Sequence, residues 1–196
     1  MRKAGWGLLV SRAGEWRTEG FADVVGDNGA WADHQAGRSF DEDAFERFLD
    51  WFAAQPVAPQ WLVLPDIVAG GLKSLELSLR YQNRCLSIAP VVLIAVQDGM
   101  QPSDLEPIVG RNVGIFLGGS TEWKLGNMAL WGSFCARRGV YYHVARVNTE
   151  RRIWMAVAAG ADSVDGSSGS RFASTVPMLN RALHQQDMFA PRLMVT

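Results

Sequence analysis

Residues 90–98 read PVVLIAVQD, a continuous apolar run that ends on an amide and a carboxylate. Such a run is typical of a strand in a parallel sheet, where both faces are covered. Three further apolar runs also end on an aspartate: FADVVGD (21–27), WLVLPD (61–66) and ADSVD (161–165). Four carboxylates therefore lie at predicted strand ends: Asp27, Asp66, Asp98 and Asp165.

Strands and helices are predicted to alternate along the whole chain. The predicted strands are Gly7–Ser11, Phe21–Asp27, Trp61–Leu64, Pro90–Val96, Val113–Leu117, Val140–Val147 and Ala161–Val164. The main helices between and after them are Leu72–Leu86, Trp123–Arg138, Glu150–Ala159 and Phe172–Gln185. Two more helices are expected behind capping boxes that begin at Ser39 and Ser103. This order predicts the α/β class with a parallel sheet.

The arrangement of the sheet has two alternatives, a closed barrel and an open doubly wound sheet. An open sheet favours a glycine-rich phosphate loop after its first strand, and the sequence contains neither GxGxxG nor GxxxxGK[ST]. We therefore expect a compact TIM-type (β/α) barrel. The chain has 196 residues, fewer than the roughly 250 of a typical barrel, so a reduced or irregular first β/α unit is expected. Residues 1–196 are interpreted as one domain with a loosely ordered tail at 187–196.

Composition narrows the class of protein. The chain is 48% hydrophobic and 20% charged, with a net charge of -1, so no overall basic field favours nucleic acid. No apolar run is long enough to span a membrane, and the first residues lack a signal-peptide core. Cys85 and Cys135 lack CxxC spacing, and the three histidines lack metal-ligand spacing. These observations predict a cytoplasmic protein without a metal or another cofactor.

The strand-end carboxylates predict one polar site, because parallel barrels place their chemistry at the carboxyl ends of the strands. Asp66 lies in an apolar stretch and must face a partner or a cavity. Structural interpretations stay open for the others: Asp27 can form a turn with Asn28 and Gly29, and Asp98 can cap a helix before Pro102.

Several other residues are candidates for contacts with a ligand. Gly118 and Gly119 offer backbone N–H groups, or only a strand-to-helix turn. His143 and Arg146 are expected to point into the barrel, although a lone strand histidine is more often a core residue. Candidates for base stacking or phosphate contacts are Trp31, Trp123, Lys73, Lys124, Arg146 and Arg171, with burial in the core the alternative for both tryptophans.

The sequence contains no pattern for a serine nucleophile or a metal centre, which leaves carboxylate chemistry. Two carboxylates on opposite sides of a pocket can split an N- or O-glycosidic bond, one attacking the sugar carbon and the other handling protons. The amide of Gln97 and the glycine backbone would then hold a planar leaving group.

The order of these motifs resembles the tRNA-guanine transglycosylase (queuine tRNA-ribosyltransferase) superfamily, barrel enzymes that exchange a guanine-type base. The similarity runs from about Val25 to Arg171. The segments that carry it are DNGA (27–30), PD (65–66), VQDG (96–99), LGG (117–119) and VNTE (147–150) with AAGADSVD (158–165). The residues in these segments are most similar to those of short transglycosylase-like proteins of phages and bacteria.

The resemblance implies a role for each matching residue. Asp165 would be the nucleophile and Asp27 the group that manages protons. Asp66, Gln97, Gly118 and Gly119 would bind the base, and Arg171 matches an arginine that follows the nucleophile. Arg146 joins the predicted substrate-binding residues as a candidate phosphate contact, without a counterpart in the family. The resemblance gives no role to Asp98, because in the matching segment its neighbour Gln97 contacts the base.

The chain also departs from the family. It lacks the three-cysteine-one-histidine zinc subdomain, which favours DNA carrying a 7-deazaguanine or another modified base over intact tRNA. We expect an enzyme that exchanges or removes a base in nucleic acid or a nucleotide, with a free modified base as the second partner. The alternatives are a base-hydrolysing DNA glycosylase, a glycoside hydrolase and a non-catalytic base-binding barrel. The resemblance also implies a homodimer.

Overall fold

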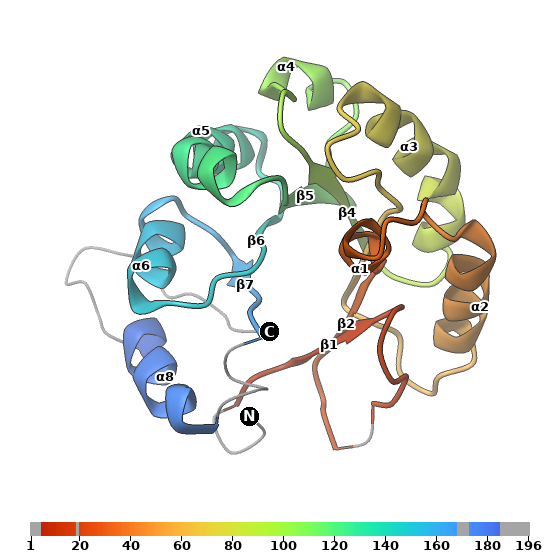
Figure 1. The fold of residues 1–196 in the computed structure, drawn as a ribbon, viewed down its shortest axis with the longest axis horizontal. Coiled ribbons are helices and arrows are strands. Elements are labelled where there is room, and N and C mark those ends of the chain that lie inside the picture. Colours follow the sequence, from red (N-terminus) through yellow and green to blue (C-terminus); the bar gives the residue numbers. More distant parts are fainter. Residues whose placement is uncertain (1–4, 19, 168–172, 185–196) are drawn as a thin grey trace.

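The computed structural model describes residues 5–18, 20–167 and 173–184. In these residues a sheet of seven parallel strands follows the order of the chain. The strands are β1 (Leu8–Ser11), β2 (Val24–Asp27), β3 (Trp61–Val63), β4 (Val91–Val96), β5 (Val113–Leu117), β6 (Tyr142–Val144) and β7 (Ser163–Val164). The sheet curls into an arc with helices around its outer side (Figure 1). The predicted α/β class and parallel sheet are confirmed.

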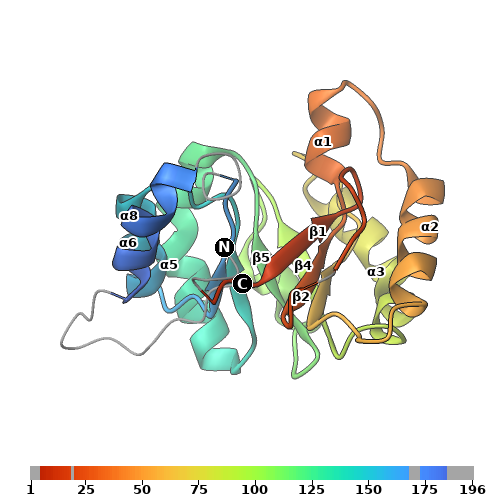
Figure 2. The same ribbon diagram turned by 90° about the horizontal axis from the view of Figure 1, so that it is seen from below.

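Helices follow the strands with one early exception. They are α1 (Ala30–Gln35), α2 (Glu42–Ala53), α3 (Leu72–Leu86), α4 (Pro102–Leu105), α5 (Thr121–Arg138), α6 (Glu150–Ala158) and α8 (Val176–His184), the last preceded by a 3-10 turn at Ala173–Thr175. Between β1 and β2 the described residues contain no helix, in agreement with the expected irregular first unit. Helix α1 projects beyond the sheet directly after β2 (Figure 2).

The arc is open between its first and last strands. In the described ranges no backbone ladder joins β1 to β7. The indole Nε1 of Trp6, ahead of β1, instead donates to Asn180 Oδ1 in α8 at 3.1 Å. The structure thus contains a curled parallel half-barrel, and closure into a complete TIM-type barrel stays a prediction.

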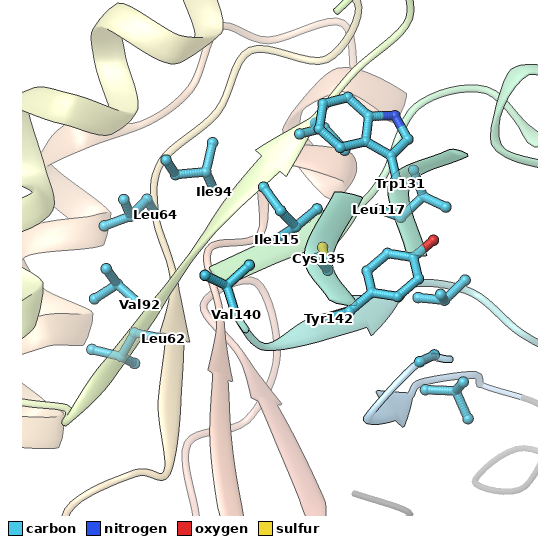
Figure 3. Close-up of a cluster of buried hydrophobic side chains, with 14 of the residues drawn as sticks. Leu62, Leu64, Val92, Ile94, Ile115, Leu117, Trp131, Cys135, Val140 and Tyr142 are labelled. Atoms are coloured by element: carbon cyan, nitrogen blue, oxygen red, sulfur yellow. The ribbon is translucent and has the colours of Figure 1, made fainter. Parts of the chain in front are cut away.

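Each face of the sheet has its own apolar core. Side chains on the convex face pack against the helices, where α5 contributes Trp131 and Cys135 (Figure 3). The concave face carries a smaller cluster: Val25, Trp61, Val63, Leu93, Ala95, Phe116 and Ala145. Along β4, residues alternate between the two cores, with Ile94 outside and Leu93 inside. Burial on both faces explains why this strand reads as a continuous apolar run.

Several predicted boundaries are wrong by a few residues. Helix α2 begins after Asp41, whose carboxylate accepts from the Ala44 N–H at 2.8 Å, so Ser39 is not the cap. Helix α4 begins after Gln101 rather than Ser103, because the fixed φ of Pro102 suits the first helical position.

The helices and the two cysteines test the predictions about membrane spans and cysteine pairing. None of the helices in the described ranges combines the length and the apolar character that crossing a bilayer requires. Cys85 and Cys135 are buried and free, packed in the outer core.

Candidate active site

A pocket of about 580 Å³ lies at the carboxyl ends of the strands. Its lining includes seven of the predicted site residues: Asp27, Asp66, Gln97, Gly118, Gly119, Arg146 and Asp165. Residues on the concave face, including Ala95 and Phe116, also line it. The eighth predicted residue, Arg171, lies outside the described residues. The parallel sheet brings the others together because every strand ends at the same edge.

Asp165 follows β7 and is held by hydrogen bonds at both carboxylate oxygens. Oδ1 accepts from the backbone N–H of Arg146 at 2.7 Å, and Oδ2 lies 3.1 Å from Nε2 of His143. Burial alone would raise the pKa of Asp165. The hydrogen bond and charge of His143, the Arg146 N–H and the charge of Lys124 outweigh burial, and together they lower it. The lowered pKa favours the ionised form of Asp165, and with 19% of its side chain exposed a ligand can reach the carboxylate.

Asp27 ends β2, and its pKa is shifted in the direction opposite to that of Asp165. Its Oδ2 accepts from the Ser11 hydroxyl at 2.8 Å and from the Gly29 N–H at 3.1 Å, so the residue also forms the turn that its sequence allows. Burial raises the pKa of Asp27, and the negative charge of Asp165 raises it further, against the Ser11 hydrogen bond. A pocket that drives two carboxyl pKa values apart is suited to one nucleophile and one proton carrier.

Asp66 lies just after β3 and is buried, with 5% exposure. Its oxygens accept from two side-chain amides: Asn28 Nδ2 at 2.6 Å, and Gln97 Nε2. Burial raises the pKa of Asp66 to about 7, the charge of Asp27 raises it as well, and the amide hydrogen bonds oppose the shift. Asp66 therefore titrates closer to neutral pH than an ordinary carboxyl group does.

Gln97 completes this group with an acceptor that has no partner. The side chain is 3% exposed, and its Oε1 makes no hydrogen bond to the described part of the chain. A buried acceptor without a partner is costly, typically by about 1–3 kcal/mol. Because Gln97 lines the pocket beside Asp66, a ligand N–H could satisfy it.

The glycine segment after β5 has a smaller donor role than the sequence suggested. The N–H of Gly118 donates to Val96 O at 3.1 Å and so is engaged within the sheet. Gly119 has a φ of 70°, a conformation that favours glycine, and a Cβ there would lie 2.6 Å from Asp98 Oδ2. Among the described residues no backbone acceptor binds the Gly119 N–H, so of the two glycines Gly119 is the one that stays a candidate donor.

Asp98 lies outside the pocket lining and has a structural role. Its carboxylate accepts from both the N–H and the hydroxyl of Ser120 at 2.6 Å, directly before α5. Capping of a helix before Pro102 is therefore wrong, because Asp98 ties the end of β4 to the start of α5.

Arg146 reaches the pocket by a route that the sequence did not indicate. The predicted strand Val140–Val147 ends at Val144, and Arg146 has a φ of 56°, a left-handed conformation unusual for this residue type. This turn directs its N–H to Asp165, while its guanidinium donates to Gly119 O and lies 4.3 Å from the ring centroid of Trp31. A strained residue that contacts both sides of a pocket is a frequent feature of functional sites.

The other aromatic and basic candidates differ in whether they are exposed or buried, and in whether they lie at the pocket. Trp31 is 42% exposed at the pocket, whereas Trp123 packs against the outer core. Lys124 is 1% exposed and its Nζ donates to Ala145 O, so a direct phosphate contact by this lysine is wrong. Burial and the charge of Arg146 lower the pKa of Lys124 to about 8. Lys73 is exposed near the start of α3.

Two side chains that contact the pocket carboxylates, Ser11 and Asn28, were not among the residues predicted from the sequence. His143 was expected to point into the barrel, but its contact with Asp165 was not predicted. Asn28 adjoins Asp27, and its amide could have been suspected from that position alone. The contact between His143 and Asp165 depends on strand register, which no local pattern reveals.

In the described residues no group of three or more His, Cys, Asp or Glu side chains could hold a metal ion. No family model, no curated protein and no solved structure matches this chain.

Proposed function

We propose that this protein is an enzyme that cleaves or exchanges the N-glycosidic bond of a guanine-type or modified base, with DNA favoured over intact tRNA. The observation that carries the proposal is the pair Asp165 and Asp27. Both line one pocket, one with a lowered and the other with a raised pKa. The curled parallel sheet supports an incomplete TIM-type barrel as the scaffold.

The proposed reaction has two steps. An oxygen of Asp165 attacks the anomeric carbon of the sugar, the C–N bond breaks, and its electron pair moves to the base, which takes a proton from Asp27. In the second step an incoming base or a water molecule displaces Asp165, and Asp27 accepts the proton that this nucleophile loses. Exchange and hydrolysis differ only in the second nucleophile.

The polar group beside the carboxylates supports a heterocycle as the leaving group. Asp66 and the unpartnered Oε1 of Gln97 offer adjacent acceptors, which suit the N1–H and N2–H donors of a guanine-type base. A sugar leaving group would use hydroxyls that donate as well as accept, so this one-sided group of acceptors favours a base over a second sugar.

Mass spectrometry after incubation with DNA, RNA and free nucleosides tests the proposal. Release of a base from one of them supports it, and incorporation of a labelled 7-deazaguanine-type base identifies exchange. Tight binding without turnover would favour the non-catalytic alternative. Size-exclusion chromatography tests the homodimer, which is inferred from the resemblance alone.

Binding of the base should depend on pH through Asp66. Its raised pKa of about 7 means that the carboxylate loses its proton as the pH rises through neutrality. If only the ionised form accepts from the base, affinity should increase about tenfold between pH 6 and pH 8. Titration of guanine into the protein by calorimetry measures this change.

The matched variant is Asp66→Asn, which keeps the size of the side chain and removes its titration. Its affinity for guanine should be weak and nearly constant over the same pH range. A wild-type affinity that stays flat, or falls, between pH 6 and pH 8 would show that Asp66 does not receive the base as an ionised acceptor.

A further inference from the structure

His143 is an ionisable residue that is fully buried beside the pocket. Its side chain is fully buried in β6 on the concave side of the sheet. The ring stacks on Phe116, with centroids 4.9 Å apart and planes at 13°, and it contacts Trp61 at 4.9 Å. Packing of this density leaves an imidazole little freedom to turn. The positions of its two nitrogen atoms are therefore set by the core.

Both nitrogens of His143 have partners, one on β7 and one directly after it. Nδ1 lies 2.7 Å from Ser163 Oγ, and Nε2 lies 3.1 Å from Asp165 Oδ2. His143 and Ser163 are paired in the strand register, and Asp165 follows two residues later on the same face. The sheet thus lines up a hydroxyl, an imidazole and a carboxylate.

This order of groups decides which proton of the ring faces Asp165. An ionised carboxylate only accepts hydrogen bonds, so Nε2 carries the proton that faces Asp165, whether the ring is charged or neutral. The Ser163 hydroxyl can pair with Nδ1 in both cases, because a hydroxyl accepts from a charged ring and donates to a neutral one. Ser163 thereby holds the ring so that the Nε2–H points at Asp165.

We propose that His143 is a positioning residue which, with Ser163, holds Asp165 in one orientation and in its ionised form for attack on the sugar. This role rests on the proposed function, in which Asp165 is the nucleophile. The N–H of Arg146 fixes the other oxygen, so two donors from different directions define the carboxylate plane. A carboxylate that is already aligned loses little freedom on reaching the transition state.

Other charges also act on Asp165 and set the background for a test. Lys124 from α5 favours its ionised form, and Asp27 from β2 interacts with both Asp165 and His143. Tyr141 lies at the far end, where its hydroxyl interacts with Ser163. None of these groups replaces the direct contact of His143 with Oδ2, so a change at His143 should reach Asp165 first.

Two substitutions of His143 separate orientation from packing. His143→Phe keeps a flat ring and removes both hydrogen bonds, and kcat should fall about 100-fold with KM within about twofold. His143→Gln places an amide donor near the position of Nε2 and should recover about tenfold of that loss. Ser163→Ala leaves the ring in place and should lower kcat by about threefold to tenfold. His34→Gln, an exposed histidine on α1, is the matched control.

The ionisation of Asp165 gives a readout that needs no substrate. Because His143 lowers the pKa of Asp165, His143→Phe should raise it, and a ¹³C NMR titration of the Asp165 carboxyl measures the shift. The acid limb of the kcat profile should move to higher pH in parallel.

Two results would overturn the positioning role. One is an unchanged Asp165 titration in both His143→Phe and Ser163→Ala; the other is a loss of thermal stability with kcat and its acid limb unaltered. If no nucleic acid or nucleoside is cleaved by the wild-type protein while the NMR shift appears, the contact of His143 with Asp165 stands and the proposed function fails.

Discussion

Replacing Asp165 with asparagine should abolish the covalent glycosyl adduct and reduce base release or exchange by at least about 10³-fold. An amide oxygen is a poor nucleophile, and asparagine carries no charge to stabilise the positive charge that develops on the sugar. The side chain keeps its size and an acceptor for the Arg146 N–H, so the fold should be retained. Intact-protein mass spectrometry detects the adduct, and thermal unfolding checks the fold.

Asp98→Asn is the matched control for this prediction. Asp98 also follows a predicted strand end, but it lies outside the pocket lining and binds Ser120. The Asp98→Asn variant should have nearly the activity of the wild type. Its free energy of unfolding should be slightly lower, because the hydrogen bonds to Ser120 at the start of α5 are weaker. Turnover by Asp165→Asn at the parental rate would show that another group attacks the sugar.

Replacing Arg12 with methionine should lower the free energy of unfolding by about 3 kcal/mol, because it leaves a buried carboxylate without its nearest cation. Arg12 forms an ion pair with Asp33, and both side chains are at most 5% exposed. Its Nε also donates to Asn28 O at 2.6 Å, and Nη2 donates to Gly29 O at 3.3 Å. In the variant, the charged partner that Asp33 would keep among the described residues is the exposed Arg38, at 3.1 Å.

The loss should depend on pH. Burial would raise the pKa of Asp33, but Arg38 and Arg12 outweigh it, and the pKa is lowered from 3.8. Stability from a lowered carboxyl pKa is present above the unfolded value and disappears as the pH falls through the folded value. The difference between wild type and Arg12→Met should therefore be largest near pH 7 and shrink below about pH 4.

Urea unfolding at about pH 7 and below about pH 4 measures the difference in the free energy of unfolding between wild type and Arg12→Met. The control is Arg17→Met, since Arg17 pairs with Glu15 on the surface, where both side chains are more than 70% exposed. Exposed ion pairs contribute little, so its midpoint should stay near that of the wild type. Equal midpoints for Arg12→Met and wild type would contradict a structural role for the buried pair.

Arg12 also connects stability to the candidate site. The carbonyls that it binds belong to Asn28 and Gly29, and these residues in turn contact Asp66 and Asp27. Loss of Arg12 should therefore loosen the turn that orders two of the three pocket carboxylates. Sequence patterns predicted the turn but not the arginine beneath it, because that contact crosses from the β1–β2 connection to the start of α1.

The amino-acid sequence by itself determined the α/β class, the parallel sheet and the meeting of the carboxylates at one edge. A strand buried on both faces must be apolar throughout, so local patterns predict the parallel sheet. Parallel strands all end on the same side, so the same patterns predict that the carboxylates meet at one edge. Helix starts were less predictable, because Asp41 and Gln101 could compete with the serines at neighbouring positions.

Only the tertiary structure decided how the four strand-end carboxylates divide. Asp98 turns to Ser120, whereas Asp27, Asp66 and Asp165 face the pocket. Their different protonation depends on burial and on partners from other strands, such as His143 for Asp165 and Asn28 for Asp66. Register and curvature bring these partners together across 20 or more intervening residues, and a local sequence pattern contains no information about either.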